Sequence, residues 1–363
     1  MSGAADAVQR GDDPYVVVQP EALRAFTQKI YEGFGAAPED AWLIADSLVA
    51  ADLWGHPSHG VQRAAAYVAR IKTGTINPRA RGIIVEERDS IAQIDGQAGF
   101  GQVIAAQAMR LAIAKARGRG IAAVQVKNSN HFGTCGYWAR MALPHDMIGF
   151  AATNASILLP PHGGRAPRIG NNPWAFAIPT AEEPPLVLDM AQAVAAVGKV
   201  QVAAHTGSKI PLTWATDRDG NPTDDPHEVL RGGMYLPIGT YKGFGQAMVV
   251  DALCGLLGGQ PWATIHGLTR DIDQPARLGH FFMAIDISCF IDPGTFKRLV
   301  DQMIRGIRAT PLAPGYDRIY SPGEPEALAA ARYREGVPIL RHALDELNAL
   351  AAEAGIDDRL EPL

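Results

Sequence analysis

The chain has 363 residues, of which 47% are hydrophobic and 20% charged, and its formal net charge is −5. This length accommodates two or three domains, or one large domain with a smaller satellite, and this composition is typical of a globular protein with a substantial core. A mildly acidic chain without a basic tract argues against binding to nucleic acids or to anionic membranes.

Cysteine usage further restricts the class of protein. Cys135, Cys254 and Cys289 are widely spaced and form no CxxC pair. Neither a disulfide framework nor a cysteine-based zinc site is therefore expected, and a reducing cytoplasm is the natural location for such a chain.

The pattern predicts neither a signal peptide nor a membrane span. Residues 1–15 are polar and acidic, without the apolar stretch of a signal peptide, and we expect residues 1–14 to form a mobile tail. The longest apolar run, residues 247–257, is interrupted by Asp251 and is too short to cross a bilayer.

Helical patterns dominate the first part of the chain. Pro20 begins one that extends to Gly33, where glycine can adopt the left-handed conformation that ends a helix. Pro38 begins a second helix, and a third is expected over residues 61–72. Residues 15–78 are therefore predicted to form an N-terminal helical subdomain.

Strands and helices alternate in the middle of the chain. A hairpin is expected over residues 83–94 and a long helix over residues 100–117. Further strands are expected at residues 121–126, 148–153, 174–178, 186–188 and 280–285, and further helices at residues 136–143, 193–205 and 242–257. This alternation is typical of an α/β domain, which we place over residues 79–308. Residues 309–363 are mostly helical in pattern and are expected to pack on the N-terminal subdomain.

Polar residues cluster after the strand expected at residues 121–126, where Asn128, Ser129 and Asn130 precede His131. Ligands gather at the carboxyl ends of strands in α/β sheets, and the pKa of histidine suits acid–base catalysis near neutrality. A structural loop residue is the alternative for His131 taken alone. Four adjacent polar residues at a strand end, however, need polar partners.

A second histidine, His59, lies in the turn between two predicted helices. Ser58 is a candidate N-cap for the helix that follows, and Arg63 lies one turn after His59, where both side chains can face one cleft. Arginine binds carboxylates through a two-pronged fork, although a solvated surface arginine is the alternative. Together with His131, these residues predict an enzyme that acts on a small carboxylate.

Two further charged residues lie at predicted element ends. Asp189 follows the strand at residues 186–188, where it would orient a histidine, bind a ribose hydroxyl or cap the next helix. Lys242 lies among glycines at a helix start, where it would meet a phosphate or the amide edge of a cofactor, or remain exposed. No GxGxxG motif follows a strand, and no P-loop, HExxH motif or convincing metal site is present in the sequence.

These motifs, taken in order, resemble the type-2 malate/L-lactate dehydrogenase family, which includes ureidoglycolate and sulfolactate dehydrogenases, 2,3-diketogulonate reductase and piperideine-2-carboxylate reductase. The resemblance spans about residues 20–356. It rests on SHGVQR at 58–63, GTINP at 74–78, NSNHFG at 128–133, TN at 153–154, GNNP at 170–173, LDMA at 188–191, GK at 198–199, YKGFG at 241–245 and PGEPE at 322–326.

The resemblance implies an NAD(P)H-dependent oxidoreductase of small 2-keto or 2-hydroxy acids, or a reductase of cyclic 2-imino acids such as piperideine- or pyrroline-2-carboxylate. It implies an α/β fold of the L-sulfolactate dehydrogenase type. In that fold a mixed, mostly antiparallel central sheet binds the dinucleotide without a Rossmann motif, and both chain ends build a helical subdomain. Homodimers are implied as well, with no nucleic-acid or membrane partner.

The resemblance also assigns roles to residues. His59 and His131 would be the acid–base pair, Ser58 and Arg63 would hold the carboxylate or carbonyl of the substrate, and Asp189 belongs to the same catalytic set. The cofactor, NAD or NADP, would contact Asn154, Asn172, Asp189, Met190, Ala191, Tyr241, Lys242, Gly323, Glu324 and Pro325.

The chain departs from the family pattern near the expected cofactor strand. Gln192 and Ala193 stand where Thr-Ser is usual, Val197 where arginine is usual, and Asn171 where threonine is common. These differences leave the choice between NAD and NADP, and the particular acid, open. A non-redox lyase that uses the two histidines on the same acids, and a binding protein without turnover, are the alternatives.

Overall fold

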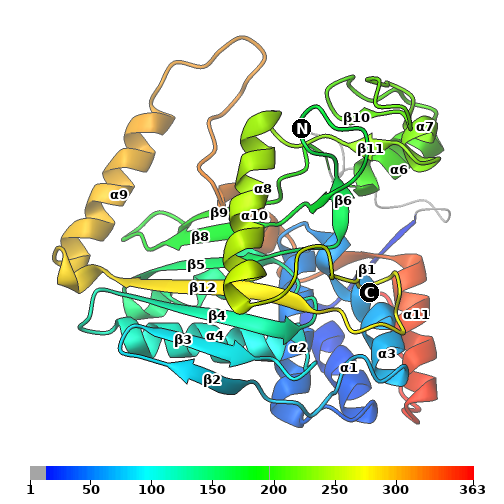
Figure 1. Ribbon diagram of the computed structural model, residues 1–363, viewed down its shortest axis with the longest axis horizontal. Helices are drawn as coiled ribbons and strands as arrows, with labels where there is room; N and C mark the ends of the chain where they lie inside the picture. The colour runs from blue at the N-terminus through cyan, green and yellow to red at the C-terminus, as the bar shows by residue number, and fades with distance from the viewer. Residues whose placement is uncertain (1–13, 196) are drawn as a thin grey trace.

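The computed structural model describes residues 14–195 and 197–363 and centres on a seven-stranded sheet (Figure 1). From edge to edge the strands are β2 (Ile83–Glu87), β3 (Ile91–Asp95), β4 (Ile121–Ser129), β12 (Leu278–Asp286), β5 (Met147–Thr153), β8 (Trp174–Ile178) and β9 (Leu186–Met190). β3 and β4 run parallel, and the other neighbouring strands pair antiparallel. The mixed, mostly antiparallel sheet is therefore confirmed.

The order of strands along the chain does not give their order in the sheet, because β12 lies between β4 and β5. β4 and β5 follow one another along the chain and are joined through helix α5 (Cys135–Arg140), which would suggest parallel neighbours. Instead β12, from much later in the chain, lies between them and pairs antiparallel with both. Met283 of β12, for example, lies opposite Ala123 on one side and Phe150 on the other.

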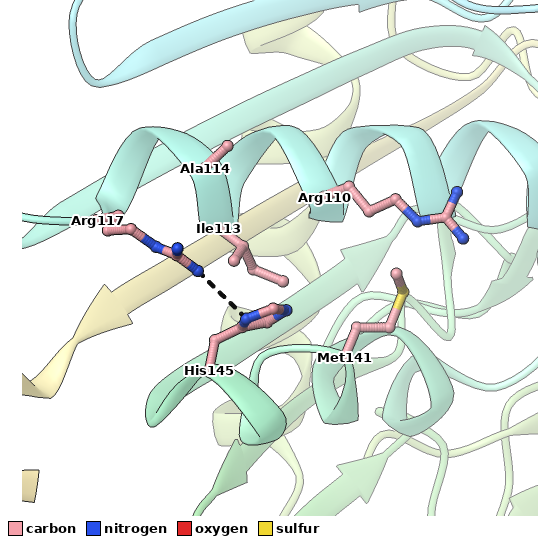
Figure 2. A pocket seen from close by; sticks show the side chains of 6 residues that line it. All are labelled: Arg110, Ile113, Ala114, Arg117, Met141 and His145. Atoms are coloured by element: carbon pink, nitrogen blue, oxygen red, sulfur yellow. Dashed lines mark hydrogen bonds between the residues drawn. The ribbon is translucent and has the colours of Figure 1, made fainter.

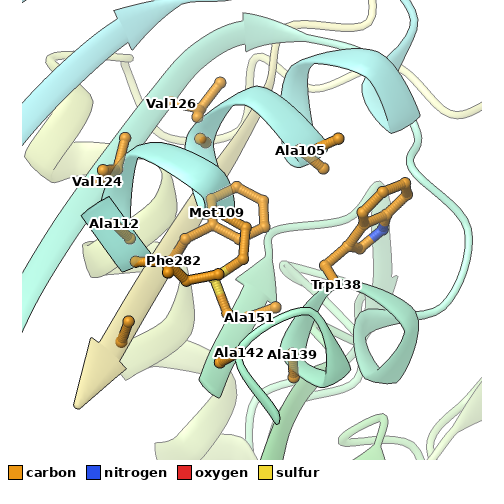
Figure 3. Close-up of a cluster of buried hydrophobic side chains, with 14 of the residues drawn as sticks. Ala105, Met109, Ala112, Val124, Val126, Trp138, Ala139, Ala142, Ala151 and Phe282 are labelled. Carbon is orange, nitrogen blue, oxygen red and sulfur yellow. The ribbon is translucent and has the colours of Figure 1, made fainter. Parts of the chain in front are cut away.

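Helices cover both faces of the sheet. On one face Phe282 of β12 packs with Met109 of α4 (Gly101–Ala116) and with Trp138 of α5 in the main core (Figure 3). On the other face Phe281 packs against a smaller cluster that contains Val250 of α8 (Tyr241–Cys254). Because both faces are buried, the strands read as apolar runs rather than as a clean alternation.

The two ends of the chain share a second hydrophobic core. β1 (Tyr15–Val18) pairs antiparallel with β13 (Val337–Leu340), a small sheet that the sequence pattern did not reveal. The helices of this unit are α1 (Pro20–Gly33), α2 (Pro38–Leu53), α3 (Ala64–Lys72) and α11 (Arg341–Glu353). Ile30, Tyr67 and Leu347 are buried in the common interior, so N-terminal and C-terminal helices form one packed unit.

The remaining elements lie outside the sheet and this helical unit. They are β6 (Ile157–Leu159), β7 (Ile169–Gly170), β10 (Ala215–Thr216), β11 (Met234–Tyr235), α6 (Val197–Thr206), α7 (Pro226–Leu230), α9 (Pro293–Arg308) and α10 (Glu324–Arg332), with 3-10 turns η3 (Leu143–His145), η4 (Leu256–Gly258) and η5 (Ile287–Cys289). α9 and the chain that follows it project from the body (Figure 1). Within the part of the chain that the structure describes, no helix combines the length and hydropathy needed to cross a membrane.

The expected cap of the third helix was wrong. Ser58 lies inside the 3-10 turn η1 (Pro57–His59) and makes no capping hydrogen bond, because a second 3-10 turn, η2 (Val61–Arg63), separates it from α3. The residue at the N-cap of η2 is Gly60. The Ser58 hydroxyl is therefore not used by a helix end and is free to serve the site.

One glycine fixes the loop that carries His131. Gly101 begins α4, and a Cβ atom at this position would clash with the backbone carbonyl oxygens of Asn130 and His131. The loop thus lies directly against the first residue of the helix, an approach that glycine alone permits. Together with β4, this contact sets the position of the His131 backbone.

Candidate active site

The two histidines predicted from separate motifs lie together. His59 ends η1 and His131 follows β4, and their rings stack with centroids 5.7 Å apart and an interplanar angle of 23°. Both side chains keep partial access to solvent. Since one ring comes from the helical unit of the chain ends and the other from the loop after β4 of the sheet, the site lies where these two parts meet.

A buried carboxyl group holds the turn that carries His59. Asp52, near the end of α2, accepts a hydrogen bond of 2.9 Å from the backbone N–H of Val61. A Cβ atom on Gly60 would clash with this carboxyl group. Burial raises the pKa of Asp52 well above its usual range. Asp52 and Gly60 therefore fix the backbone immediately after His59.

Ser58 and Arg63 complete the part of the site that this turn provides. The Ser58 hydroxyl lies 3.0 Å from His59 Nδ1, and Arg63 Nε donates a 2.6 Å hydrogen bond to the carbonyl of Ser58. The terminal guanidinium nitrogens of Arg63 have no hydrogen-bond partner among the described residues. They are therefore available for a carboxylate, which arginine binds through two parallel hydrogen bonds.

Tyr67 belongs to the site although the sequence reasoning missed it. Its hydroxyl lies 2.6 Å from His131 Nδ1, and the backbone N–H of Gly133 donates to the same nitrogen at 3.3 Å. A backbone N–H can only donate, so Nδ1 accepts, and the neutral ring carries its proton on Nε2. Tyr67 follows Arg63 by four residues, a helical spacing that would have been a usable signal.

His280 packs against the loop that carries His131, and the sequence reasoning missed this residue as well. Its ring stacks on Phe132 with centroids 4.6 Å apart, and its Nδ1 lies 2.8 Å from the hydroxyl of Thr153. Burial lowers its pKa to about 3, so the ring is neutral. Because Phe132 directly follows His131, this stack fixes the loop. The sequence showed His280 as one residue of an apolar strand, which carries no such signal.

Desolvation and nearby positive charge keep both catalytic candidates neutral. Burial, with smaller contributions from Arg63 and His56, lowers the pKa of His59 to about 4. Burial, with His59 and Arg63, holds the pKa of His131 well below its usual range. Both effects disfavour the charged ring. At neutral pH the site therefore presents two uncharged imidazoles beside a guanidinium cation.

Asp189 lies within β9 and not after its end, as the sequence had suggested. Its carboxylate accepts a 2.6 Å hydrogen bond from the backbone N–H of Gly136. One side remains open to solvent, but protein surrounds the rest of the group, and this burial raises the pKa of Asp189 to about 6. Charged groups that influence it are His56, Arg140 and Glu326, so it belongs to a cluster beside the histidine pair.

The segment after Asp189 contains two further predicted cofactor residues, Met190 and Ala191. Met190 ends β9 and lies opposite Trp174 of β8. Gln192 comes next, fully buried, and both of its side-chain amide atoms lack a hydrogen-bond partner among the described residues. A buried amide without partners is costly, which makes this strand end suited to a polar ligand.

Asn154 and Asn172 are buried and committed to protein groups. Asn154 accepts from the backbone N–H of Gly279 at 2.9 Å and donates to Asp251 at 3.1 Å. Asn172 accepts from the N–H of Ala155 at 2.9 Å and donates to a carbonyl of α8 at 2.8 Å. Their amides connect the end of β5 and the start of β8 to α8. A part in cofactor binding would therefore be indirect, through the position of these strand ends relative to α8.

The third predicted cofactor segment, Gly323, Glu324 and Pro325, lies beside β9. Gly323 has a φ of 87°, and a Cβ atom on it would press against Val187 of β9 at 3.0 Å. The Glu324 carboxylate is buried and pairs with Arg308 at 3.2 Å and with Arg318. Its side chain is therefore occupied within the protein, and a ligand contact at this residue would involve the backbone.

Tyr241 and Lys242 begin α8, away from the histidines. Tyr241 is 61% exposed, with its ring 6.2 Å from that of His162. Lys242 is exposed and has no carboxylate within ion-pair distance among the described residues. A lysine at the positive end of a helix of this length suits an anionic group such as a phosphate.

A cavity of about 450 Å³ lies elsewhere on the molecule (Figure 2). It is lined by Arg110, Ile113, Ala114, Arg117, Met141 and His145. A helix rises about 1.5 Å per residue, so Arg110 lies on the order of 13 Å along α4 from Gly101, where the His131 loop is packed. The cavity is thus separate from the histidine site. Among residues 14–195 and 197–363, no three His, Cys, Asp or Glu side chains are grouped to hold a metal ion.

Comparison with known proteins gives close matches over nearly the whole chain. The solved sulfolactate dehydrogenase of Methanocaldococcus jannaschii has a TM-score of 0.89 at 36% identity, covering 94% of this chain and 98% of that one. The malate dehydrogenase of Pyrococcus horikoshii is 40% identical over 354 residues, 95% of this chain and 98% of its own. The Delta(1)-pyrroline-2-carboxylate/Delta(1)-piperideine-2-carboxylate reductase of Pseudomonas syringae pv. tomato is 30% identical over 355 residues, 95% of this chain and 99% of its own.

The shared fold and these similarities define the class of protein: it is an oxidoreductase, a dehydrogenase that acts on a hydroxy acid. The family model described as malate/L-lactate dehydrogenase matches residues 18–348. The chain belongs to the malate/L-lactate dehydrogenase family. The resemblance read from the motifs is thus confirmed, whereas the roles of the individual residues remain predictions.

The hydrogen bond between Tyr67 and His131 gives a first prediction. Tyr67→Phe should lower kcat about tenfold at nearly unchanged stability, because the ring still fills the core while Nδ1 loses its 2.6 Å partner. Tyr31→Phe is the matched control, since the Tyr31 hydroxyl is equally buried and has no partner among the described residues. Steady-state kinetics and thermal unfolding measure both effects, and equal kcat in the two variants would remove Tyr67 from the site.

Proposed function

We propose that the protein is an NAD(P)-dependent oxidoreductase that transfers a hydride between the nicotinamide and a small 2-keto or 2-hydroxy acid of the malate or lactate type. The observation that carries the proposal is the stack of His59 on His131 beside the free terminal nitrogens of Arg63. This arrangement combines groups for proton transfer with an anchor for a carboxylate.

The structure supports a distinct role for each group. Arg63 would hold the substrate carboxylate, with Ser58 beside it. His131, whose neutral ring carries its proton on Nε2, would donate a hydrogen bond to the carbonyl or alkoxide oxygen. His59 would take up or supply the proton. We include Asp189 in this set because His56 links it electrostatically to the histidine turn.

The dehydrogenase class implies a nicotinamide cofactor, NAD or NADP, which would supply or accept the hydride. Three features suit a dinucleotide: an ammonium on Lys242 and an amide on Gln192 that have no partner among the described residues, and the solvent-accessible carboxylate of Asp189. We propose that it is held by Asn154, Asn172, Asp189, Met190, Ala191, Tyr241, Lys242, Gly323, Glu324 and Pro325.

A second candidate is the reduction of a cyclic 2-imino acid. It is favoured by the similarity to the Pseudomonas syringae reductase, whose name gives pyrroline- and piperideine-2-carboxylate as substrates. The same residues would serve, since the substrate again carries a carboxylate next to the carbon that receives the hydride. A few side chains of the pocket decide between such substrates.

We further propose that the chain is organised as a tail at 1–14, a helical unit at 15–78, a catalytic domain at 79–308 and C-terminal helices at 309–363. Residues 1–13 of the tail lie outside the described residues. The absence of CxxC pairs among the three cysteines of the sequence supports a cytoplasmic location.

A second copy of this chain is the partner we propose for the exposed face of α9. Leu299, Met303 and Ile307 form an apolar stripe on this helix and are 50%, 48% and 55% exposed. Val300 and Ile304, on the adjacent face of the helix, are already buried. Exposed apolar stripes of this kind mark interaction surfaces, and a two-fold homodimer is the commonest way to cover one.

The activity is tested by following NAD(P)H at 340 nm with pyruvate, oxaloacetate, sulfopyruvate, phenylpyruvate, 2,3-diketogulonate and piperideine-2-carboxylate, each with NADH and NADPH. We expect turnover of at least one acid, with a preference for one dinucleotide. His131→Ala should still quench NAD(P)H fluorescence but turn over far more slowly. Absence of both turnover and dinucleotide binding in the unmodified protein would overturn the proposal in favour of a lyase.

The carboxylate anchor is tested separately. Arg63→Lys should lower kcat/KM for the acid by about tenfold or more, because lysine keeps the charge but not the two-pronged geometry. The KM for the dinucleotide should change little. A kcat/KM equal to that of the unmodified enzyme would show that another group binds the carboxylate.

The dimer is tested by light scattering in solution, which should give a mass of about twice 38.7 kDa. Met303→Glu combined with Ile307→Glu should shift the protein toward the monomer, since charges would replace the exposed stripe. Leu328→Glu is the control, because Leu328 is 45% exposed on a different helix, α10. A monomer before any substitution would refute the proposed partner.

A further inference from the structure

We propose that Glu326 is a positioning residue for the active site: through His56 it holds the η1 turn so that the ring of His59 stays against His131. Glu326 lies in the first turn of α10, in the C-terminal part of the chain. Its Oε1 is 3.3 Å from Nε2 of His56. The inference rests on the function proposed above, because it assigns the pair a task in aligning the proposed acid–base group.

His56 is the residue that connects this contact to the site. It is the N-cap of η1, and its carbonyl accepts a 2.9 Å hydrogen bond from the backbone N–H of His59. Its own N–H donates to the carbonyl of Ala51 at 2.8 Å. A shift of His56 therefore moves the backbone of His59 directly, without any intervening flexible segment.

The turn is fixed at its two ends by different means. After His59, the buried Asp52 holds the N–H of Val61 at 2.9 Å. Before it, the chain reverses at Gly55, which has a φ of 76°, and the hydrogen bond to Glu326 is the side-chain contact that His56 makes across this reversal. Loss of the Glu326 contact would leave His56 held by its backbone hydrogen bonds to Ala51 and His59, while the side chains of Gln62 and Arg63 still bind carbonyls of η1.

Charges around Glu326 support the same arrangement. The hydrogen bond to His56 lowers the pKa of Glu326, and the charge of Arg140 contributes. The Arg140 guanidinium lies 4.8 Å from the ring centroid of Trp54, at the end of α2. The cluster also reaches the cofactor strand, because the negative charge of Glu326 contributes to the raised pKa of Asp189.

The contact between His56 and Glu326 is too exposed to contribute much to the stability of the fold. The side chains of His56 and Glu326 are 41% and 28% exposed, and ion pairs of this kind contribute little to folding. A small displacement of a catalytic group, by contrast, is costly, since about 1 Å can lower a rate by roughly two orders of magnitude. The contact is therefore expected to matter for kcat far more than for Tm.

The test compares Glu326→Gln with Glu353→Gln. Glu353 of α11 pairs with Lys72 of α3 at 2.5 Å, so this ion pair also joins the two ends of the chain, and it is similarly exposed. Lys72 is the last residue of α3, whereas Arg63 directly precedes that helix, so the pair lies away from the histidines. We expect Glu326→Gln to lower kcat about tenfold and to change Tm by no more than about 2 °C, and Glu353→Gln to change neither. The loss should disappear when Glu326→Gln is added to His56→Ala, because the two residues act as one unit.

Nuclear magnetic resonance provides a readout that does not depend on turnover. In Glu326→Gln the ring signals of His59 should move and the pKa of Asp189 should fall from about 6, since a negative charge has been removed. Both should stay unchanged in Glu353→Gln. If no dehydrogenase activity is found at all, these signals still decide the question. Unchanged His59 signals in Glu326→Gln, or an equal loss of kcat in Glu353→Gln, would overturn the positioning role.

Discussion

Partial burial of the stacked rings of His59 and His131 disfavours their protonation, and the charge of Arg63 beside them opposes it further. The rest of the site depends on this constraint. Neutral rings can lie 5.7 Å apart without repulsion, and each keeps a defined tautomer only if its other nitrogen is engaged. Tyr67 and Gly133 provide that engagement for His131, and Ser58 does so for His59.

The two-part architecture accounts for how such a pair is assembled. The sheet carries His131 on a loop pressed against Gly101 and backed by the stack of His280 on Phe132. The helical unit, in which both chain ends share a core, carries His59 on a turn held by Asp52. Residues distant in sequence thus meet where the two parts join, and the C-terminal helix α11 packs in the same core as the helices that flank the His59 turn.

Local patterns predicted most helices and strands and identified the motifs of the family. They could do so because glycine, proline and clusters of polar residues act on the conformation of their own segment. They could not place β12 between β4 and β5, since that pairing depends on contacts between distant segments. The same limit hid His280, which looks like any strand residue. Ser58 failed as a cap because a second 3-10 turn intervenes, and sequence periodicity does not distinguish that turn from the start of a helix.

With the proposed role of Arg63, the electrostatics of the site would favour acids over neutral substrates for a reason beyond simple attraction. In the free site Arg63 lowers the pKa of both histidines. A carboxylate bound to Arg63 would cancel that positive charge, so the pKa of His59 would rise toward its ordinary value as the substrate arrives. A neutral analogue of the same shape would leave the histidine difficult to protonate. If Arg63 is the carboxylate anchor, as proposed, substrate binding and protonation of His59 would be coupled through one guanidinium group, and removing its charge would change both the affinity for the acid and the pKa of His59.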